Sequence, residues 1–135
     1  MISSYCRILL FICAFMPCWL QAQHISFCEK VSKDGTPINI RNTFRIDLGN
    51  EPVYIHVEKT DSLKTTKITY KIYFINIEDS AIYQGELKEK VDPAWTYCWK
   101  EVYFNEEGLY KILVLDAKSD TICSDFLKIF KKSCK

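Results

Sequence analysis

The sequence predicts an all-β protein, an antiparallel sandwich of seven to eight strands that follows an N-terminal signal peptide. Three observations favour this class. Apolar and polar residues alternate with a period of two from residue 25 onward, as they do in strands with one buried face. Turn-forming residues recur about every ten positions, which is the spacing of sandwiches and barrels. No window shows the apolar stripe of an amphipathic helix.

Residues 1–22 have the composition of a secretory signal peptide. Arg7 is followed by the apolar run ILLFICAFM, and Ala22 supplies a small residue at the expected cleavage position. The run is short for the roughly 20 residues that cross a bilayer, so we expect no stable transmembrane segment after cleavage. The alternatives are an uncleaved anchor helix and lipidation near Cys18, although Pro17 is not the small residue that lipid transfer requires. We therefore expect a secreted or periplasmic protein.

Cleavage after Ala22 would leave 113 residues, the size of one domain. We expect the sandwich to span residues 23–130 and a basic C-terminal tail to follow at 131–135. The shortened chain carries 17 Lys and Arg against 17 Asp and Glu, and no block of like charge stands out. This balance predicts neither nucleic acid nor an anionic membrane as a partner.

Eight segments with strand patterning lie between turn sequences such as KDGTP, LGNEP and NEEG. In chain order they span residues 25–31, 38–47, 52–58, 67–77, 81–89, 97–104, 109–116 and 121–130. Alternation in the third segment predicts that its valines and isoleucine point inward, while Tyr54 and His56 point to solvent. In the fourth segment the predicted core face consists of Ile68, Tyr70, Ile72 and Phe74.

The sixth segment, residues 97–104, carries two competing faces. One holds Tyr97, Trp99 and Tyr103, and the other holds Cys98, Val102 and Phe104. Glu101 interrupts the first face and Lys100 the second, so a β-bulge near Trp99 is expected.

Two interpretations of these aromatic residues are open. In one, Phe104, Val102 and one tryptophan fill the core while the other rings cover neighbouring strands. In the other, an exposed aromatic platform binds a partner, because aromatic residues are enriched at interfaces and stack on sugars. The candidate platform residues are Trp95, Tyr97, Trp99 and Tyr103, with Tyr54 and Tyr73 as further members.

Four cysteines remain after cleavage: Cys28, Cys98, Cys123 and Cys134. An even number in an exported chain predicts disulfides, and four cysteines allow three pairings that the sequence does not distinguish. No C-x-x-C spacing occurs, so the usual pattern of a zinc or redox site is missing.

The sequence holds no catalytic or metal-binding constellation. His24 and His56 are the two histidines, and we expect the first in a frayed terminus and the second in solvent. Acidic residues at 116, 120 and 125 do not fit the calcium-loop pattern and are interpreted as turn formers. We therefore expect no metal, no cofactor and no enzymatic activity.

The stretch FNEEGLYKILVLD, residues 104–116, resembles the sixth strand of immunoglobulin-like domains and its approach. The resemblance implies that Tyr110 forms a tyrosine corner and that Ile112 and Val114 continue inward. Antibody-type domains carry a cysteine where Ile112 stands, so the resemblance is to the disulfide-free branch, either fibronectin type III-like or bacterial immunoglobulin-like. The same register implies neighbouring first and last strands, with Cys28 within reach of Cys123.

These observations predict a secreted, non-enzymatic sandwich that binds an unknown protein or a glycan at a cell surface or in a periplasm. One alternative is an inhibitor of a protease or other enzyme that presents KVDPAW, because Pro93 fixes the backbone there, or a small hydrolase on the same scaffold. Another is a structural surface subunit that is linked to its neighbour through Cys134.

Overall fold

The computed structural model describes residues 23–133, so the expected signal peptide, Cys18 and Cys134 lie outside the described residues. Nine strands make up this part of the chain, where the sequence predicted seven to eight. They are β1 (Gln23–Val31), β2 (Pro37–Ile40), β3 (Thr43–Ile46), β4 (Pro52–Lys59), β5 (Lys67–Ile75), β6 (Ala81–Lys90), β7 (Tyr97–Tyr103), β8 (Gly108–Leu115) and β9 (Thr121–Lys131).

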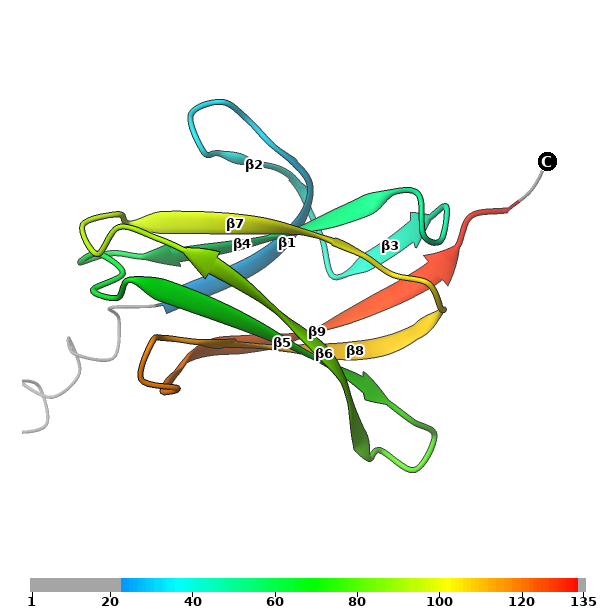
Figure 1. The fold of residues 1–135 in the computed structure, drawn as a ribbon. Helices are drawn as coiled ribbons and strands as arrows, with labels where there is room; N and C mark the ends of the chain where they lie inside the picture. The colour runs from blue at the N-terminus through cyan, green and yellow to red at the C-terminus, as the bar shows by residue number, and fades with distance from the viewer. Residues whose placement is uncertain (1–22, 134–135) are drawn as a thin grey trace, which may run out of the picture.

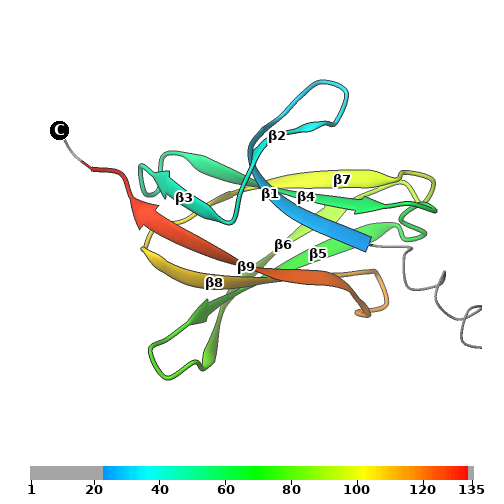
Figure 2. The same ribbon diagram turned by 180° about the vertical axis from the view of Figure 1, so that it is seen from behind.

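The strands form two sheets that pack face to face (Figures 1 and 2). The first sheet has the order β2-β1-β4-β7, and the second has the order β3-β9-β8-β5-β6. The all-β sandwich predicted from the period-two alternation is therefore confirmed. Within residues 23–133, β7 is an edge of the first sheet and β6 an edge of the second.

The core lies between the sheets and follows the predicted alternation. Val53, Ile55 and Val57 of β4 are fully buried, as are Ile68 and Tyr70 of β5. The remaining two members of the predicted β5 face, Ile72 and Phe74, are partly buried against this core. Burial of these side chains is the main force that holds the two sheets together.

The expected single strand at 38–47 is wrong, because the chain changes sheets within it. Asn39 adopts a left-handed backbone conformation (φ 58°). Arg41 N then donates to Phe27 O of β1, whereas Asn42 O accepts from Lys128 N of β9. The segment is thus β2 on one sheet and β3 on the other, and β3 pairs with β9 in parallel, which departs from the purely antiparallel sandwich expected.

The tyrosine corner implied by the resemblance is confirmed. The Tyr110 hydroxyl donates to Glu106 O at 2.8 Å, and the ring packs against Phe104 with centroids 4.7 Å apart. Ile112 and Val114 follow as fully buried residues of β8. The corner therefore fixes the turn between β7 and β8 and closes one end of the core.

The C-terminal strand β9 runs through Lys131, one residue into the expected tail. Lys131 N donates to a Glu107 carboxylate oxygen, and Lys132 N donates to Ile46 O at 2.8 Å. Backbone hydrogen bonds therefore tie the described part of the tail to the sandwich.

Candidate binding surface on strand β7

Strand β7 alternates without interruption between an outward and an inward face. Its register with β4 is continuous from Pro52 opposite Tyr103 to Glu58 opposite Tyr97, so the bulge expected near Trp99 is wrong. A bulge is unnecessary because β7 is an edge strand, where a charged inward side chain such as Lys100 stays half-buried at the open side of the sandwich.

The aromatic residues of this region point mainly away from the core. Trp99 is 42% exposed, Tyr103 51% and Trp95 50%. The inward residues are Cys98 and Val102, and Phe104 follows them into the core. The interpretation in which a tryptophan fills the core is therefore wrong for both tryptophans that the structure describes, while its placement of Val102 and Phe104 is confirmed.

Four outward side chains of β4 and β7 lie together, and we name them the β7 face: Tyr54, Trp99, Glu101 and Tyr103. Tyr54 stands directly opposite Glu101, so it lies diagonal to both Trp99 and Tyr103. Partial burial, and then the neighbouring Glu101 carboxylate, raise the pKa of the Tyr54 hydroxyl. Aromatic rings around a carboxylate can stack on planar groups and attract cations.

Tyr97 belongs to a different arrangement from the rest of the predicted platform. Its ring stacks on His56 with centroids 5.7 Å apart, and its hydroxyl donates to Asp34 O at 3.3 Å. The turn between β1 and β2, which rises above the outer face of the first sheet in Figure 1, covers both rings. Gly35 in this turn has φ +87°, and its backbone lies directly against the Tyr97 ring. Tyr97 therefore anchors the turn.

The expectation that His56 is solvated is wrong, since its side chain is 1% exposed. His56 Nε2 lies 2.8 Å from Gly35 O, and because a carbonyl oxygen accepts, Nε2 is the donor of this hydrogen bond. His56 Nδ1 has no hydrogen-bond partner among the described residues and lies 3.7 Å from a Glu58 carboxylate oxygen. Alternation placed His56 correctly on the outward face, but the turn that covers it comes from more than 20 residues away.

The inward side of β7 contacts a polar cluster that the sequence did not reveal. The Tyr70 hydroxyl lies 3.1 Å from a Glu89 carboxylate oxygen and 3.3 Å from Cys98 Sγ. Burial raises the pKa of the Glu89 carboxyl, although Tyr70 and Lys100 oppose this. The hydrogen bond to Tyr70 explains why an acidic residue is tolerated on an inward position of β6.

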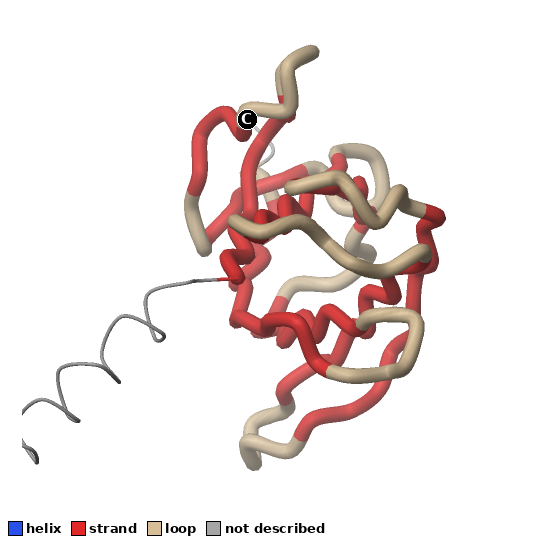
Figure 3. Tube along the Cα trace, turned by 90° about the vertical axis from the view of Figure 1, so that its left-hand side faces the viewer, coloured by secondary structure: helices blue, strands red, loops and turns tan. Residues whose placement is uncertain are grey.

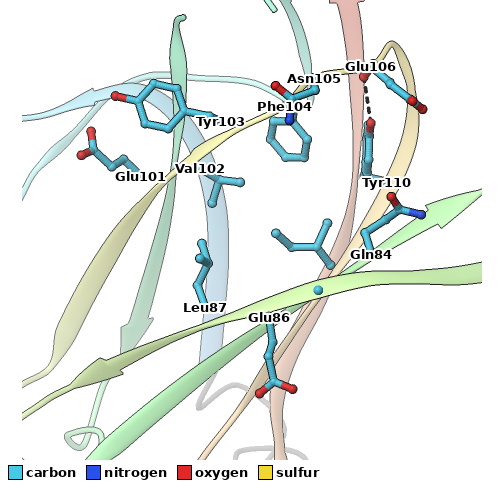
Figure 4. Close-up of a pocket in the computed structure, with 12 residues that line it drawn as sticks. Gln84, Glu86, Leu87, Glu101, Val102, Tyr103, Phe104, Asn105, Glu106 and Tyr110 are labelled. Atoms are coloured by element: carbon cyan, nitrogen blue, oxygen red, sulfur yellow. Dashed lines mark hydrogen bonds between the residues drawn. The ribbon is translucent and has the colours of Figure 1, made fainter. Parts of the chain in front are cut away.

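Two cavities open between the edges of β6 and β7. The first, of about 440 Å³, lies beside Trp95, Cys98 and Glu89. The second, of about 490 Å³, is the one in Figure 4, where Leu87 of β6 and Val102 of β7 point toward each other. Figure 4 also shows that Glu86 and Tyr103 point away from this gap. The second cavity is therefore lined by apolar side chains such as Leu87 and Phe104 together with polar residues such as Gln84 and Asn105.

Trp95 lies in the loop before β7. The end of the sandwich to which this loop belongs, at the left of Figure 1, faces the viewer in Figure 3. This loop is tied to the loop between β4 and β5, because Trp95 O accepts from Leu63 N and Pro93 O accepts from Lys64 N. Both carbonyl groups therefore accept hydrogen bonds within the protein and are not free for a partner. This argues against the inhibitor loop proposed from KVDPAW.

The three described cysteines are free thiols, so the Cys28–Cys123 bridge is wrong. Cys28 points to the outer face of the first sheet, where its Sγ lies 3.8 Å from Tyr54 O. Cys123 belongs to the second sheet and packs against the core. Burial raises the pKa of Cys98 and of Cys123 to about 12, and it also raises that of Cys28. These thiols are therefore protonated and weakly nucleophilic at neutral pH.

The acidic residues near 116–120 form a turn, as predicted. Asp116 Oδ1 accepts from Lys118 N and Asp120 N, both at 2.9 Å. Within residues 23–133, no group of three or more His, Cys, Asp or Glu side chains is arranged to hold a metal ion. The same residues include no helix of the length and apolarity needed to cross a membrane.

Comparison with known proteins gives a structural match but no sequence match. Neither a protein-family profile nor a curated protein matches the chain. A solved structure of an immunoglobulin-like protein from Pseudomonas aeruginosa is similar, with a TM-score of 0.52 and 13% sequence identity. The alignment covers 82% of this chain and 98% of that protein. Together with the two-sheet topology and the tyrosine corner, this match shows that the chain has an immunoglobulin-like β-sandwich fold.

Proposed function

We propose that the protein is a non-enzymatic, extracytoplasmic module that binds another macromolecule through the β7 face. The observation that carries this proposal is the exposure of Trp99 and Tyr103 around Glu101 on one side of an edge strand. Tryptophan and tyrosine contribute large contact areas at protein interfaces, and they are over-represented among residues that dominate binding energy.

The proposal of a binding protein also agrees with the state of the potential catalytic groups. The His56 ring is buried under the turn between β1 and β2, so it cannot reach a substrate without displacement of that turn. The buried Cys98 and the partly buried Cys123 hold their protons at neutral pH. Export is supported by the composition of residues 1–22.

Affinity capture from an extract of the native envelope tests the proposal. The wild type should retain a specific partner, and the double variant Trp99→Ala/Tyr103→Ala should lose at least nine-tenths of it, because truncation of an aromatic residue that dominates an interface weakens binding by about tenfold or more. Tyr83→Ala is the matched control, since Tyr83 is also 51% exposed but lies on β6 in the other sheet. Equal capture by the double variant and the control would refute the assignment to the β7 face.

A further inference from the structure

The free edge of β7 presents unpaired backbone groups beside the β7 face. Lys59 N donates to Thr96 O, which fixes the phase of the antiparallel ladder between β4 and β7. The backbone groups of the inward residues Cys98, Lys100 and Val102 therefore point toward β4. Those of the outward residues point away from β4, where the structure of residues 23–133 provides no neighbouring strand; these residues are Tyr97, Trp99, Glu101 and Tyr103.

The two cavities lie in line with this edge. One is beside Cys98 and the other beside Val102. These residues are four positions apart on β7, or about 13 Å at the rise of a strand. An extended chain that pairs with β7 would direct every second side chain inward, so two of its side chains four positions apart would enter the two cavities. Apolar residues line part of each cavity, Leu87 and Phe104 at one and Trp95 at the other, and these parts suit apolar side chains.

The outer surface beside the same edge is acidic. The outward positions of β4 and β7 carry Glu58 and Glu101 but no Lys or Arg. Trp99 and Tyr103 flank Glu101, and aromatic faces attract Lys and Arg side chains. The outward side chains of a chain added here would therefore be favoured if they were basic.

Lys100 makes the edge selective. It points inward between the two cavities, and an inward charge on an edge strand discourages pairing with an arbitrary apolar strand. Burial raises the pKa of the nearby Glu89 carboxyl, and the charge of Lys100 partly opposes this rise. A pairing segment must therefore place a small polar residue opposite Lys100, between its two apolar residues.

From this geometry we propose that the free edge of β7 pairs with an extended segment of another protein, in which basic side chains alternate with apolar or small polar ones. The segment adds a strand to the first sheet, with its apolar side chains in the two cavities and its basic side chains on the β7 face. The inference rests on the proposed function in that both use Trp99, Glu101 and Tyr103, and it adds the chemistry of the partner and the role of the backbone.

A synthetic peptide tests this proposal. The nonapeptide TRVRTRVRT has two valines four positions apart, threonine between them and arginine at the alternate positions. Hydrogen exchange measured by NMR should show at least tenfold slower exchange of the edge amides when the peptide is added, namely those of Tyr97, Trp99, Glu101 and Tyr103. The amides of Cys98, Lys100 and Val102, which face β4, should change little. The isomer TTTVVRRRR and the acidic analogue TEVETEVET should produce no such protection.

Two substitutions at one position separate charge from backbone pairing. Glu101→Gln removes an ion pair and should weaken peptide binding about fivefold. Glu101→Pro also removes a free-edge N–H, which an edge strand tolerates, and should weaken binding about tenfold more than Glu101→Gln. Thermal unfolding of each variant shows whether the fold is retained.

Three outcomes would overturn the proposal: equal binding of all three peptides, binding without alternating amide protection, or protection of the edge amides by a second copy of this chain when no peptide is present. If the peptide does not bind but capture of a partner from the envelope extract still depends on Trp99 and Tyr103, the proposed function stands without this inference. If both fail, neither stands.

Discussion

Tyr103 and Phe104 are adjacent in the sequence but point to opposite sides of the sheet, so their alanine variants should differ sharply in stability. Phe104 is 3% exposed and packs against Tyr110, and truncation of such a buried ring costs about 4 kcal/mol. Tyr103 is 51% exposed on an edge strand, where a substitution costs about 1 kcal/mol. For a domain of this size, where each kcal/mol shifts Tm by about 4 °C, the expected losses are about 16 °C and about 4 °C.

Differential scanning calorimetry of the two variants measures both losses. The same samples, kept well below their Tm values, should show the reverse order in partner capture, because Phe104 lies beneath the surface and Tyr103 forms part of the β7 face. If Tyr103→Ala lost as much stability as Phe104→Ala, Tyr103 would be a core residue, and the assignment of a binding role to its exposed ring would be refuted.

Three further predictions concern buried groups. Burial raises the pKa of Glu89 above its ordinary value of 4.5, so the folded state holds this proton more tightly than the unfolded chain, and stability is lost as pH rises from the unfolded to the folded pKa. Urea titrations should therefore show that the free energy of unfolding of Glu89→Gln increases relative to that of the wild type as pH rises through this range. A difference between the two proteins that does not change with pH would contradict this. Gly35→Ala should cost about 2 kcal/mol more than Gly49→Ala, because both glycines have positive φ but only Gly35 has a ring directly against it; equal costs in urea would refute the packing argument. With pKa values of about 12, Cys98 and Cys123 should react with iodoacetamide at pH 8 about a thousandfold more slowly in the folded protein than in urea, and fast labelling of the folded protein seen by mass spectrometry would contradict their burial.

The period-two alternation was sufficient to predict the sandwich, because each strand has one face toward a common core. It placed Val53, Ile55 and Val57 correctly, and the resemblance of residues 104–116 to an immunoglobulin-like strand located the corner tyrosine, Tyr110. The division of residues 38–47 into two strands could not be predicted, because the change of sheet depends on pairing with β1 and β9. Apolar patterning does not reveal which distant strand supplies the hydrogen bonds.

The candidate site could be predicted only in part, because local patterning does not reveal contacts with distant strands. The sequence indicated the aromatic residues of β7, but their exposure depends on β7 being an edge, which is a property of the whole sheet. His56 was placed on the correct face, yet its burial results from contact with the distant Gly35. The cluster of Tyr70, Glu89 and Cys98 joins three strands that no local pattern connects.

Site-specific photo-cross-linking tests most directly whether β7 carries the binding function. A photoreactive phenylalanine analogue would replace either Tyr103 or Tyr83, two tyrosines of equal exposure on different sheets, and each protein would be irradiated in the native envelope extract. We predict a discrete covalent adduct from position 103 and none from position 83. Adducts of equal yield from both positions, or an adduct from position 83 alone, would contradict the account.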